Sequence, residues 1–293
     1  MNHIPVLLNE VLLTLGDVTD KTVVDCTFGA GGYSRAFLER GANVIAFDRD
    51  PASLHFAATI AREFGERFRF INEPFSQLLT LNSQLFDAIV FDFGVSSMQI
   101  DTAGRGFSWR FDAPLDMRMG VGACRARPGV CDTPLQSAAE LIQEKPVAEL
   151  ARILREYGDV TKAGPIARAM KDKLPKTTFE LRDLIFNPKD IAPVFQALRI
   201  AVNDELGEIE AALAAVPALL APGGICACVT FHSLEDRLVK NIFREWTTAP
   251  GDPRMPAAGI APFKLLKPQV PSDAETAANP RARSAHLRAV IKV

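Results

Sequence analysis

Two kinds of residue in this sequence are able to do chemistry: glycines grouped in one turn, and acids that each follow a β-rich run. The turn is Asp25-Cys26-Thr27-Phe28-Gly29-Ala30-Gly31-Gly32-Tyr33-Ser34. Glycines between a strand and a helix let the backbone approach a ligand closely, and the first amides of the helix are free to bind it. Asp48 closes the next β-rich run, where a carboxylate can accept hydrogen bonds from both hydroxyls of a ribose. Together these residues predict a site for a nucleoside-containing cofactor.

The spacing of the glycines bears on which cofactor the turn accommodates. A dinucleotide fingerprint, G-x-G-x-x-G, would require glycine at position 34, where Ser34 stands. The pattern is closer to the D-x-x-x-G-x-G turn of S-adenosylmethionine-dependent methyltransferases, whose cofactor has no pyrophosphate. Asp48 suits either cofactor, so the alternatives are an NAD-dependent oxidoreductase, a small-molecule methyltransferase, or a glycine-rich turn without a ligand. Phe75 follows the third β-rich run and either lies against an adenine or belongs to the core.

Further polar residues follow the β-rich runs that come later in the chain. Asp92 closes the run over residues 86–91, and His232 and Ser233 come directly after the run over 225–231. Ligands of open α/β sheets bind beyond the carboxyl ends of the strands, so we expect these three side chains at one edge. An acid there either accepts an N–H of an amine substrate, a role related to general-base catalysis, or only binds the cofactor. A single histidine is usually structural, but at a strand end we expect it to line the site.

Strands that alternate with helices must position these residues. The β-rich runs cover 22–26, 42–47, 67–71, 86–91 and 225–231, and the helical stretches beside them cover 33–40, 52–64 and 234–246. Such alternation is typical of βαβ units and predicts an α/β fold with a parallel sheet. We also expect one long helix over 194–220, an irregular segment over 247–283, and a terminal hairpin of strands 263–266 and 286–293.

Residues 105–200 interrupt this alternation. Helical patches occur between residues 137 and 186 with no β-rich run among them. The segment carries 16 basic and 12 acidic residues, although the whole chain has 33 basic and 35 acidic residues. We therefore predict a main domain formed by residues 1–104 and 201–293, and an inserted, mostly helical domain over 105–200. The local positive charge of the insertion suits a polyanion.

Composition and cysteine content exclude several classes of protein. No uninterrupted run of about eighteen apolar residues occurs, so we expect no membrane span, and the N-terminus lacks the pattern of a secretory signal peptide. Five cysteines without CxxC spacing suit a reducing cytoplasm better than a disulfide framework. Cys226 and Cys228 have no second pair at ligand spacing, so no metal site is predicted. The G-x-S-x-G elbow of serine hydrolases is also missing from the sequence, and the pattern leaves the oligomeric state open.

Segments spread along almost the whole chain resemble the RsmH (MraW) family, which methylates cytosine N4 in 16S ribosomal RNA. These segments are residues 3–11, 25–34, 92–97, 105–108, 114–119, 195–203, 231–237 and 279–284. The resemblance implies a class I methyltransferase-like Rossmann sheet with an inserted helical domain. It also implies S-adenosyl-L-methionine as methyl donor and, as substrate, a decoding-centre cytidine of 16S rRNA in the small ribosomal subunit.

The resemblance assigns roles to particular residues. The cofactor-binding residues of the family map onto Gly31, Gly32, Tyr33, Asp48, Phe75, Asp92 and Gln99. The exocyclic amine of cytosine is weakly nucleophilic because it is conjugated with its ring, so an acceptor for one N–H would help its lone pair to attack the methyl group. Asp92 is the catalytic candidate for this role, ahead of His232 and Ser233.

Three departures from the family pattern occur in this chain. Tyr33 stands where the family commonly has histidine, and Met98 stands where it commonly has proline. The loop over residues 121–133 is also longer than is usual in the family. Tyr33 can still bind the cofactor through its backbone N–H, so we expect activity to be retained.

The resemblance also implies contacts with RNA. The candidate RNA-binding residues are Arg105, Phe107, Trp109, Arg118, Arg281 and Arg283. Phe107, Trp109 and Phe111 either stack on unpaired bases or simply hold their loop. An alternative from a different functional class is a catalytically silent ribosome-assembly factor that keeps the fold and clamps RNA.

Overall fold

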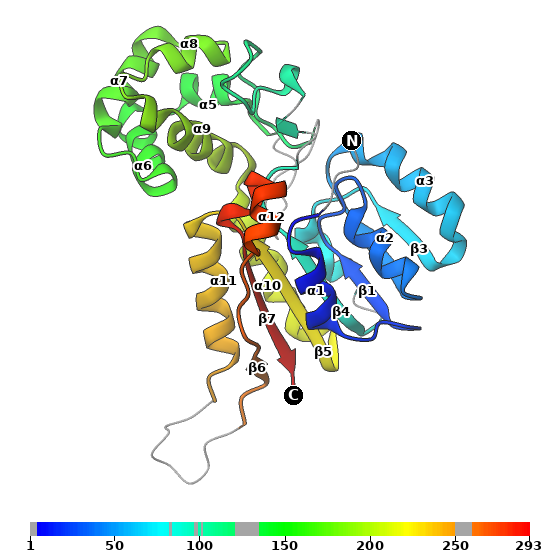
Figure 1. Ribbon diagram of the computed structural model, residues 1–293. Helices are drawn as coiled ribbons and strands as arrows, with labels where there is room; N and C mark the ends of the chain where they lie inside the picture. Colours follow the sequence, from blue (N-terminus) through cyan, green and yellow to red (C-terminus); the bar gives the residue numbers. More distant parts are fainter. Residues whose placement is uncertain (1–4, 82–83, 97–98, 101, 121–134, 250–259) are drawn as a thin grey trace. The chain divides into compact units, whose positions relative to one another are not determined.

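The computed structural model describes residues 5–81, 84–96, 99–100, 102–120, 135–249 and 260–293. The chain forms two compact units (Figure 1): residues 1–94 together with 208–293, and residues 95–207. The sequence pattern placed the insertion over 105–200, so the structural boundaries fall somewhat outside the expected ones. Met98 and the loop over 121–133, both departures from the family pattern, lie outside the described residues.

The first unit is built on a seven-stranded sheet with the order β3-β2-β1-β4-β5-β7-β6. Its strands are β1 Thr22–Asp25, β2 Asn43–Phe47, β3 Phe68–Ile71, β4 Phe86–Asp92, β5 Leu220–Thr230, β6 Phe263–Leu265 and β7 His286–Lys292. β1 to β5 pair in parallel, whereas β7 runs antiparallel to both β5 and β6. This order confirms the expected class I methyltransferase-like Rossmann sheet, in which the strand order reverses between β1 and β4.

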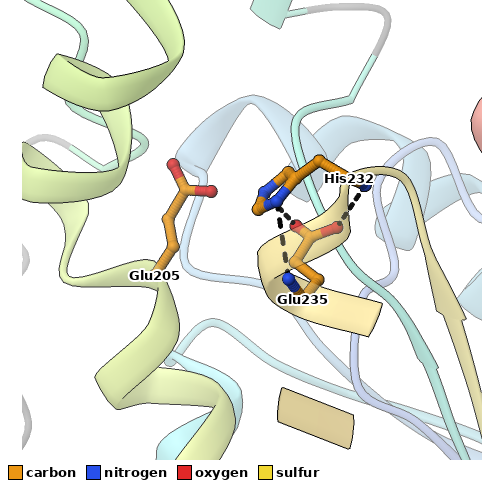
Figure 2. A group of neighbouring side chains, drawn as sticks. All are labelled: Glu205, His232 and Glu235. Carbon is orange, nitrogen blue, oxygen red and sulfur yellow. Dashed lines mark hydrogen bonds and ion pairs between the residues drawn. The ribbon is translucent and has the colours of Figure 1, made fainter. Parts of the chain in front are cut away.

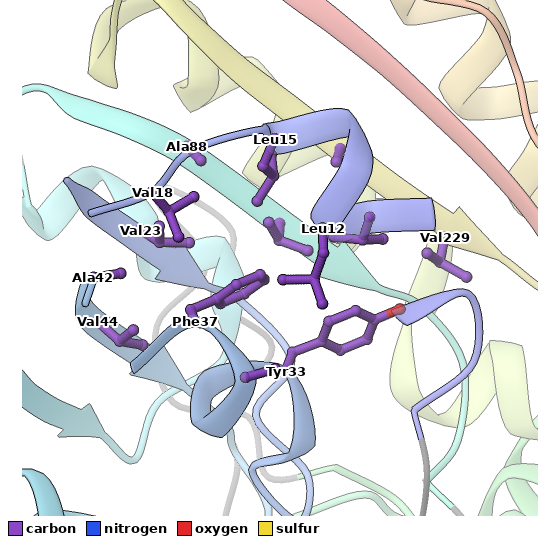
Figure 3. Packing of buried hydrophobic residues seen from close by; sticks show 14 of the residues in the cluster. Leu12, Leu15, Val18, Val23, Tyr33, Phe37, Ala42, Val44, Ala88 and Val229 are labelled. Atoms are coloured by element: carbon purple, nitrogen blue, oxygen red, sulfur yellow. The ribbon is translucent and has the colours of Figure 1, made fainter. Parts of the chain in front are cut away.

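Helices of the first unit connect these strands. They are α1 Leu8–Leu15, α2 Gly32–Glu39, α3 Leu54–Phe64, α10 Glu205–Leu219, α11 Ser233–Trp246 and α12 Asp273–Ala278. The first residues of α10 belong to the other unit. The short 3-10 turns are η1 Pro51–Ser53, η2 Gly65–Arg67, η3 Phe75–Leu81 and η5 Pro280–Ser284. Leu12 of α1 and Phe37 of α2 pack on Val23, Val44 and Ala88 of the strands (Figure 3). This packing holds α2 against the sheet. Only the turn over residues 26–31 separates the N-terminus of α2 from the carboxyl end of β1.

Two expected elements differ from the structure. The prediction of a single helix over 194–220 is wrong. α9 Pro188–Asn203 ends before Asp204, which has a left-handed φ of 50°, and α10 begins after this residue. The apolar pattern continues across this break, and Asp is one of the few residues that adopt the left-handed conformation locally. β5 also begins earlier than residue 225, and its register with β4 shifts between Phe86 and Ala88.

The C-terminal segment is more ordered than the sequence predicted. The stretch 247–283, expected to be irregular apart from the strand over 263–266, contains α12 and part of η5 as well as that strand, β6, although residues 250–259 lie outside the described residues. β6 and β7 pair antiparallel as expected. Their connection includes α12 and η5 rather than a tight hairpin turn. None of the helices in the described part of the chain combines the length and apolar character needed to cross a membrane.

The second unit is mostly helical, as the sequence predicted for the insertion. Its helices are α5 Ala138–Glu144, α6 Val147–Gly158, α7 Ala163–Lys173, α8 Thr178–Asp183 and α9, preceded by the 3-10 turn η4 Ala103–Arg105. Leu141, Ile153, Met170 and Phe195 form its core together with Met117 from the segment before the helices. This unit therefore has a hydrophobic core of its own.

Candidate functional site

Two carboxylates hold the glycine turn between β1 and α2. Asp25, at the end of β1, is fully buried and accepts hydrogen bonds from Ser34 Oγ at 2.7 Å and from the Thr27 amide at 3.1 Å. Asp48, directly after β2, accepts hydrogen bonds from the Gly29 amide at 2.7 Å and from the Asp50 amide at 2.8 Å. Burial raises the pKa of Asp25 to about 6 and also raises the pKa of Asp48. The turn is therefore tied to the ends of both strands.

Glycine is required at positions 31 and 32 for steric reasons. Gly31 has a φ of 81°, and a Cβ atom there would lie 2.5 Å from Cδ1 of Ile60. A Cβ atom at Gly32 would overlap the ring of Pro5. The amides of Gly32 and Tyr33 lie in the first turn of α2, where no intrahelical acceptor exists. They can bind an anionic group of a ligand.

The side chain of Tyr33 belongs to the core (Figure 3). Its hydroxyl donates a hydrogen bond to the carbonyl of Val6, and its ring stacks on Phe37 with centroids 6.1 Å apart. Burial raises the pKa of the Tyr33 hydroxyl well above its usual value. The side chain is therefore structural, and the backbone N–H is the group that Tyr33 offers to a ligand.

Asp92 ends β4, the strand next to β1. Its amide donates a hydrogen bond to Thr27 Oγ1 at 2.7 Å, which links β4 to the glycine turn. Its Oδ1 is buried and has no hydrogen-bond partner among the described residues. Burial raises the pKa of Asp92 well above its usual value, and the negative charges of Asp25 and Glu235 raise it further. A buried acceptor without a partner is rare in folded proteins, so Oδ1 of Asp92 is able to accept a hydrogen bond from a ligand.

Phe75, at the start of η3, lies near the same strand end. Its ring meets Phe91 and Phe93 in edge contacts, with centroid distances of 6.0 Å and 5.9 Å. The side chain is half-buried. Phe75 thus packs on the end of β4 and keeps part of its ring accessible, so both roles expected from the sequence are compatible with its position.

His232 forms the N-cap of α11 rather than standing alone at the strand end (Figure 2). Its Nδ1 accepts a hydrogen bond from the Glu235 amide at 3.4 Å, and its Nε2 lies 3.0 Å from Oε1 of Glu235. Oε2 of Glu235 accepts hydrogen bonds from the amides of Phe231 at 2.8 Å and His232 at 3.3 Å. These contacts form a reciprocal capping box. Ser233 is exposed in the first turn of the helix.

Glu235 is a site residue that the sequence reasoning missed. It is fully buried, and its charge acts on Asp92. A glutamate three residues after the N-cap position was the signal that would have identified it as part of a capping box. Histidine instead of Ser, Thr, Asp or Asn at the cap made that signal weak.

Comparison with known proteins assigns the chain to a family. The sequence model of the MraW methylase family matches residues 1–293. The chain belongs to this family. The ribosomal RNA small subunit methyltransferase H of Chelativorans sp. (strain BNC1) is 46% identical over 304 residues, covering 98% of this chain and 86% of the relative. The protein of the same name from Caulobacter vibrioides (strain NA1000 / CB15N) is 45% identical over 311 residues, covering 99% and 95%.

The structure brings most of the residues that match the family's cofactor pattern into the first unit. Gly31, Gly32, Tyr33, Asp48, Phe75 and Asp92 all follow the carboxyl ends of β1, β2, β3 and β4. Gln99 belongs to the second unit, where its Oε1 accepts a hydrogen bond from the Ser96 amide at 2.9 Å. The MraW-family pattern alone connects Gln99 with the cofactor.

The residues expected to contact RNA in the second unit are engaged within that unit. Arg105 donates hydrogen bonds to the carbonyls of Arg118 and Met119, both at 2.9 Å. Arg118 pairs with Asp116 through two hydrogen bonds of 2.7 Å. These arginines therefore stabilise the segment over residues 105–119.

The aromatic side chains of this loop are divided between core and surface. Phe107 is buried, and Trp109 meets Phe195 in an edge contact with centroids 5.8 Å apart. Phe111 is 49% exposed and is free to meet a base. In the first unit, Arg281 and Arg283 of η5 are exposed.

Proposed function

We propose that this chain transfers the methyl group of S-adenosyl-L-methionine to N4 of a cytidine in the decoding centre of 16S rRNA, within the small ribosomal subunit. Membership of the MraW methylase family supports the reaction class. The relatives named as small-subunit rRNA methyltransferases support the substrate. The observation that carries the proposal is the buried Oδ1 of Asp92, which lacks a partner among the described residues, on the strand next to β1 and its glycine turn.

The residues of the first unit fit this cofactor. S-adenosylmethionine is positively charged at its sulfonium and ammonium groups, and buried carboxyl groups such as Asp25 and Asp92 are suitable partners for a desolvated cation. Each carboxylate oxygen of Asp48 accepts one amide hydrogen bond, which leaves a second lone pair for a ribose hydroxyl. The amides of Gly32 and Tyr33 would bind the carboxylate of the cofactor. Phe75 would contact the adenine.

Asp92 is the proposed catalytic residue. S-adenosylmethionine supplies a methyl group activated by positively charged sulfur. A cation beside the Asp92 carboxyl would favour its ionised form, in which both oxygens are hydrogen-bond acceptors. The carboxylate would accept one N–H of the cytosine amine and localise the nitrogen lone pair for attack on the methyl carbon. As the N–C bond forms, the S–CH3 bond breaks to leave S-adenosylhomocysteine, and Asp92 would take up the proton that the amine loses. If Asp92 only binds the cofactor, its removal will lower cofactor affinity without a separate effect on turnover. His232 and Ser233 would shape this edge of the site through the cap of α11.

We propose residues 95–207 as the RNA-recognition unit, with Phe111 as its exposed aromatic side chain and Arg281 and Arg283 as additional phosphate contacts. This activity places the protein in the cytoplasm, where ribosomal RNA is modified. A catalytically silent assembly factor would not need a cofactor site with three acids at strand ends. Asp25, Asp48 and Asp92 are all present at such positions, which favours an active enzyme.

A complementation experiment tests the proposal. We expect mass mapping of 16S rRNA from cells without the gene to lack one N4-methyl group on a cytidine, and the wild-type gene to restore it. Asp92→Asn should not restore the methyl group, whereas Glu66→Gln, an exposed control in the same unit as Asp92, should restore it. Purified Asp92→Asn that binds S-adenosylhomocysteine normally but does not turn over would assign the catalytic role. Restoration by Asp92→Asn would refute that role, and an unchanged RNA in the deletion strain would refute the function.

A further inference from the structure

The outer face of α11 carries a stripe of basic side chains. Arg237, Lys240 and Arg244 are all exposed, and their spacing of three and four residues places them on one face of the helix. The opposite face is buried through Glu235, Val239 and Phe243. The three cations therefore project from a helix that is fixed to the sheet. We call Arg237, Lys240 and Arg244 the α11 stripe.

Of the three acids in α11, two are held by other groups, and the exposed Glu245 forms no ion pair with a stripe residue among the described residues. Asp236 accepts hydrogen bonds from Arg288 Nε at 2.7 Å and Nη2 at 2.9 Å, and the carboxylate of Glu235 is buried in the cap of the helix. Arg244 donates a hydrogen bond to the amide oxygen of Asn241 at 3.2 Å. Within the part of the chain that the structure describes, none of the three stripe residues forms an ion pair with an acid. Their positive charges are available to an external anion.

The α11 stripe begins at the edge of the sheet where the proposed methyl transfer occurs. α11 starts at Ser233, directly after β5, and β5 pairs with β4, the strand that ends in Asp92. The start of β7 lies at the same edge, because His286 pairs with Thr230 at the end of β5. The exposed Arg283 in η5 comes just before β7. The exposed Arg283 and the α11 stripe thus adjoin, in sequence, two strands that meet at this edge, and Figure 1 shows α11 running away from the end of β5.

We infer that the α11 stripe binds the phosphate backbone of the single-stranded RNA that flanks the target nucleotide, an inference that rests on the proposed function. Seven residues of α-helix span about 10 Å, so the stripe can meet successive phosphates of an extended strand. Lys and Arg at such positions bind phosphate without reading sequence. The stripe lacks the exposed aromatic or apolar anchors of a protein interface, and the apolar face of α11 is already buried in the core, which argues against a membrane surface.

Binding measured against salt tests this inference. The variant is Arg237→Gln/Lys240→Gln/Arg244→Gln in the full chain, with Lys21→Gln/Arg62→Gln/Arg69→Gln as control. The control removes three exposed basic residues from the same unit, away from α11. Each phosphate contact with a single strand contributes about 0.7 to the slope of log K against log salt. We expect the stripe variant to lose about two units of slope on deproteinised 16S rRNA, and the control to lose little.

Kinetic measurements complete the test. We expect the stripe variant to show a raised KM for small subunits, with wild-type kcat at saturation and wild-type affinity for S-adenosylhomocysteine. A wild-type slope on RNA would overturn the inference, and so would a defect that appears only with whole subunits, since that result would assign the stripe to a ribosomal protein. Methylation of small-subunit RNA by the wild-type chain in the same assay keeps a failure of the α11 inference distinct from a failure of the proposed function.

Discussion

Replacing Asp25 by asparagine should stabilise the ligand-free protein at neutral pH. The Asp25 side chain is fully buried, and burial raises its pKa from 3.8 to about 6 even though Ser34 and Thr27 donate hydrogen bonds to it. Above pH 6 the folded protein therefore holds a charged group without water around it. An amide has nearly the same shape, can accept the Thr27 hydrogen bond and can donate one to Ser34 Oγ. The substitution removes the charge while it keeps the contacts with the Thr27 amide and the Ser34 hydroxyl.

The magnitude follows from the rise in pKa. A rise of roughly two units, at about 1.4 kcal/mol per unit, amounts to about 3 kcal/mol. Because the folded pKa of an acid is raised, this destabilisation is fully present above pH 6, decreases as the pH falls from 6 to 3.8, and is lost only below 3.8, where the unfolded state is protonated as well. We expect Asp25→Asn to be more stable than wild type by up to about 3 kcal/mol at pH 7, by less than about 1 kcal/mol at pH 4, and by almost nothing at about pH 3.

Urea unfolding of the ligand-free protein between pH 4 and pH 7 measures this difference. The exposed substitution Asp172→Asn serves as the control and should not change stability with this pH profile. We also expect Asp25→Asn to bind S-adenosylhomocysteine more weakly, because a neutral amide does not balance a cationic ammonium group; this is an exchange of function for stability. Equal or lower stability of Asp25→Asn at pH 7, or a difference independent of pH, would refute the reasoning.

Two further predictions concern side chains whose roles the structure defines. Tyr33→Phe leaves the buried carbonyl of Val6 without its donor, so we expect a loss of about 1–3 kcal/mol in the free energy of unfolding. Methyl transfer by Tyr33→Phe at low temperature should stay near wild type, and a loss of activity in the folded variant would show that the side chain takes part in the site. Glu235→Gln keeps an oxygen for the backbone amides but removes a charge that raises the pKa of Asp92. The acidic limb of the pH dependence of S-adenosylhomocysteine binding should then move to lower pH, and an unchanged limb would contradict this coupling.

The sequence by itself determined the sheet and the positions of the acids at its edge. Strands that alternate with helices form a parallel sheet, and residues that follow such strands come to the same edge. For this reason Asp48 and Asp92 could be assigned to strand ends, and Gly31 and Gly32 could be assigned to the turn between a strand and a helix. These signals are local, because each depends on residue types within a few positions of the turn.

Only the tertiary structure decided what the charged and aromatic side chains contact. Arg105 and Arg118 looked available to RNA, yet they bind carbonyls and Asp116 within their own unit. The sequence assigned only the backbone N–H of Tyr33 to the cofactor, and the structure shows what its side chain contacts: the hydroxyl donates a hydrogen bond to the carbonyl of Val6, which is distant from Tyr33 in the sequence. Glu235 gained its importance from burial next to the end of β5. Local pattern specifies the elements, whereas the partner of a long side chain depends on which elements pack against it, and that is set by contacts distant in the sequence.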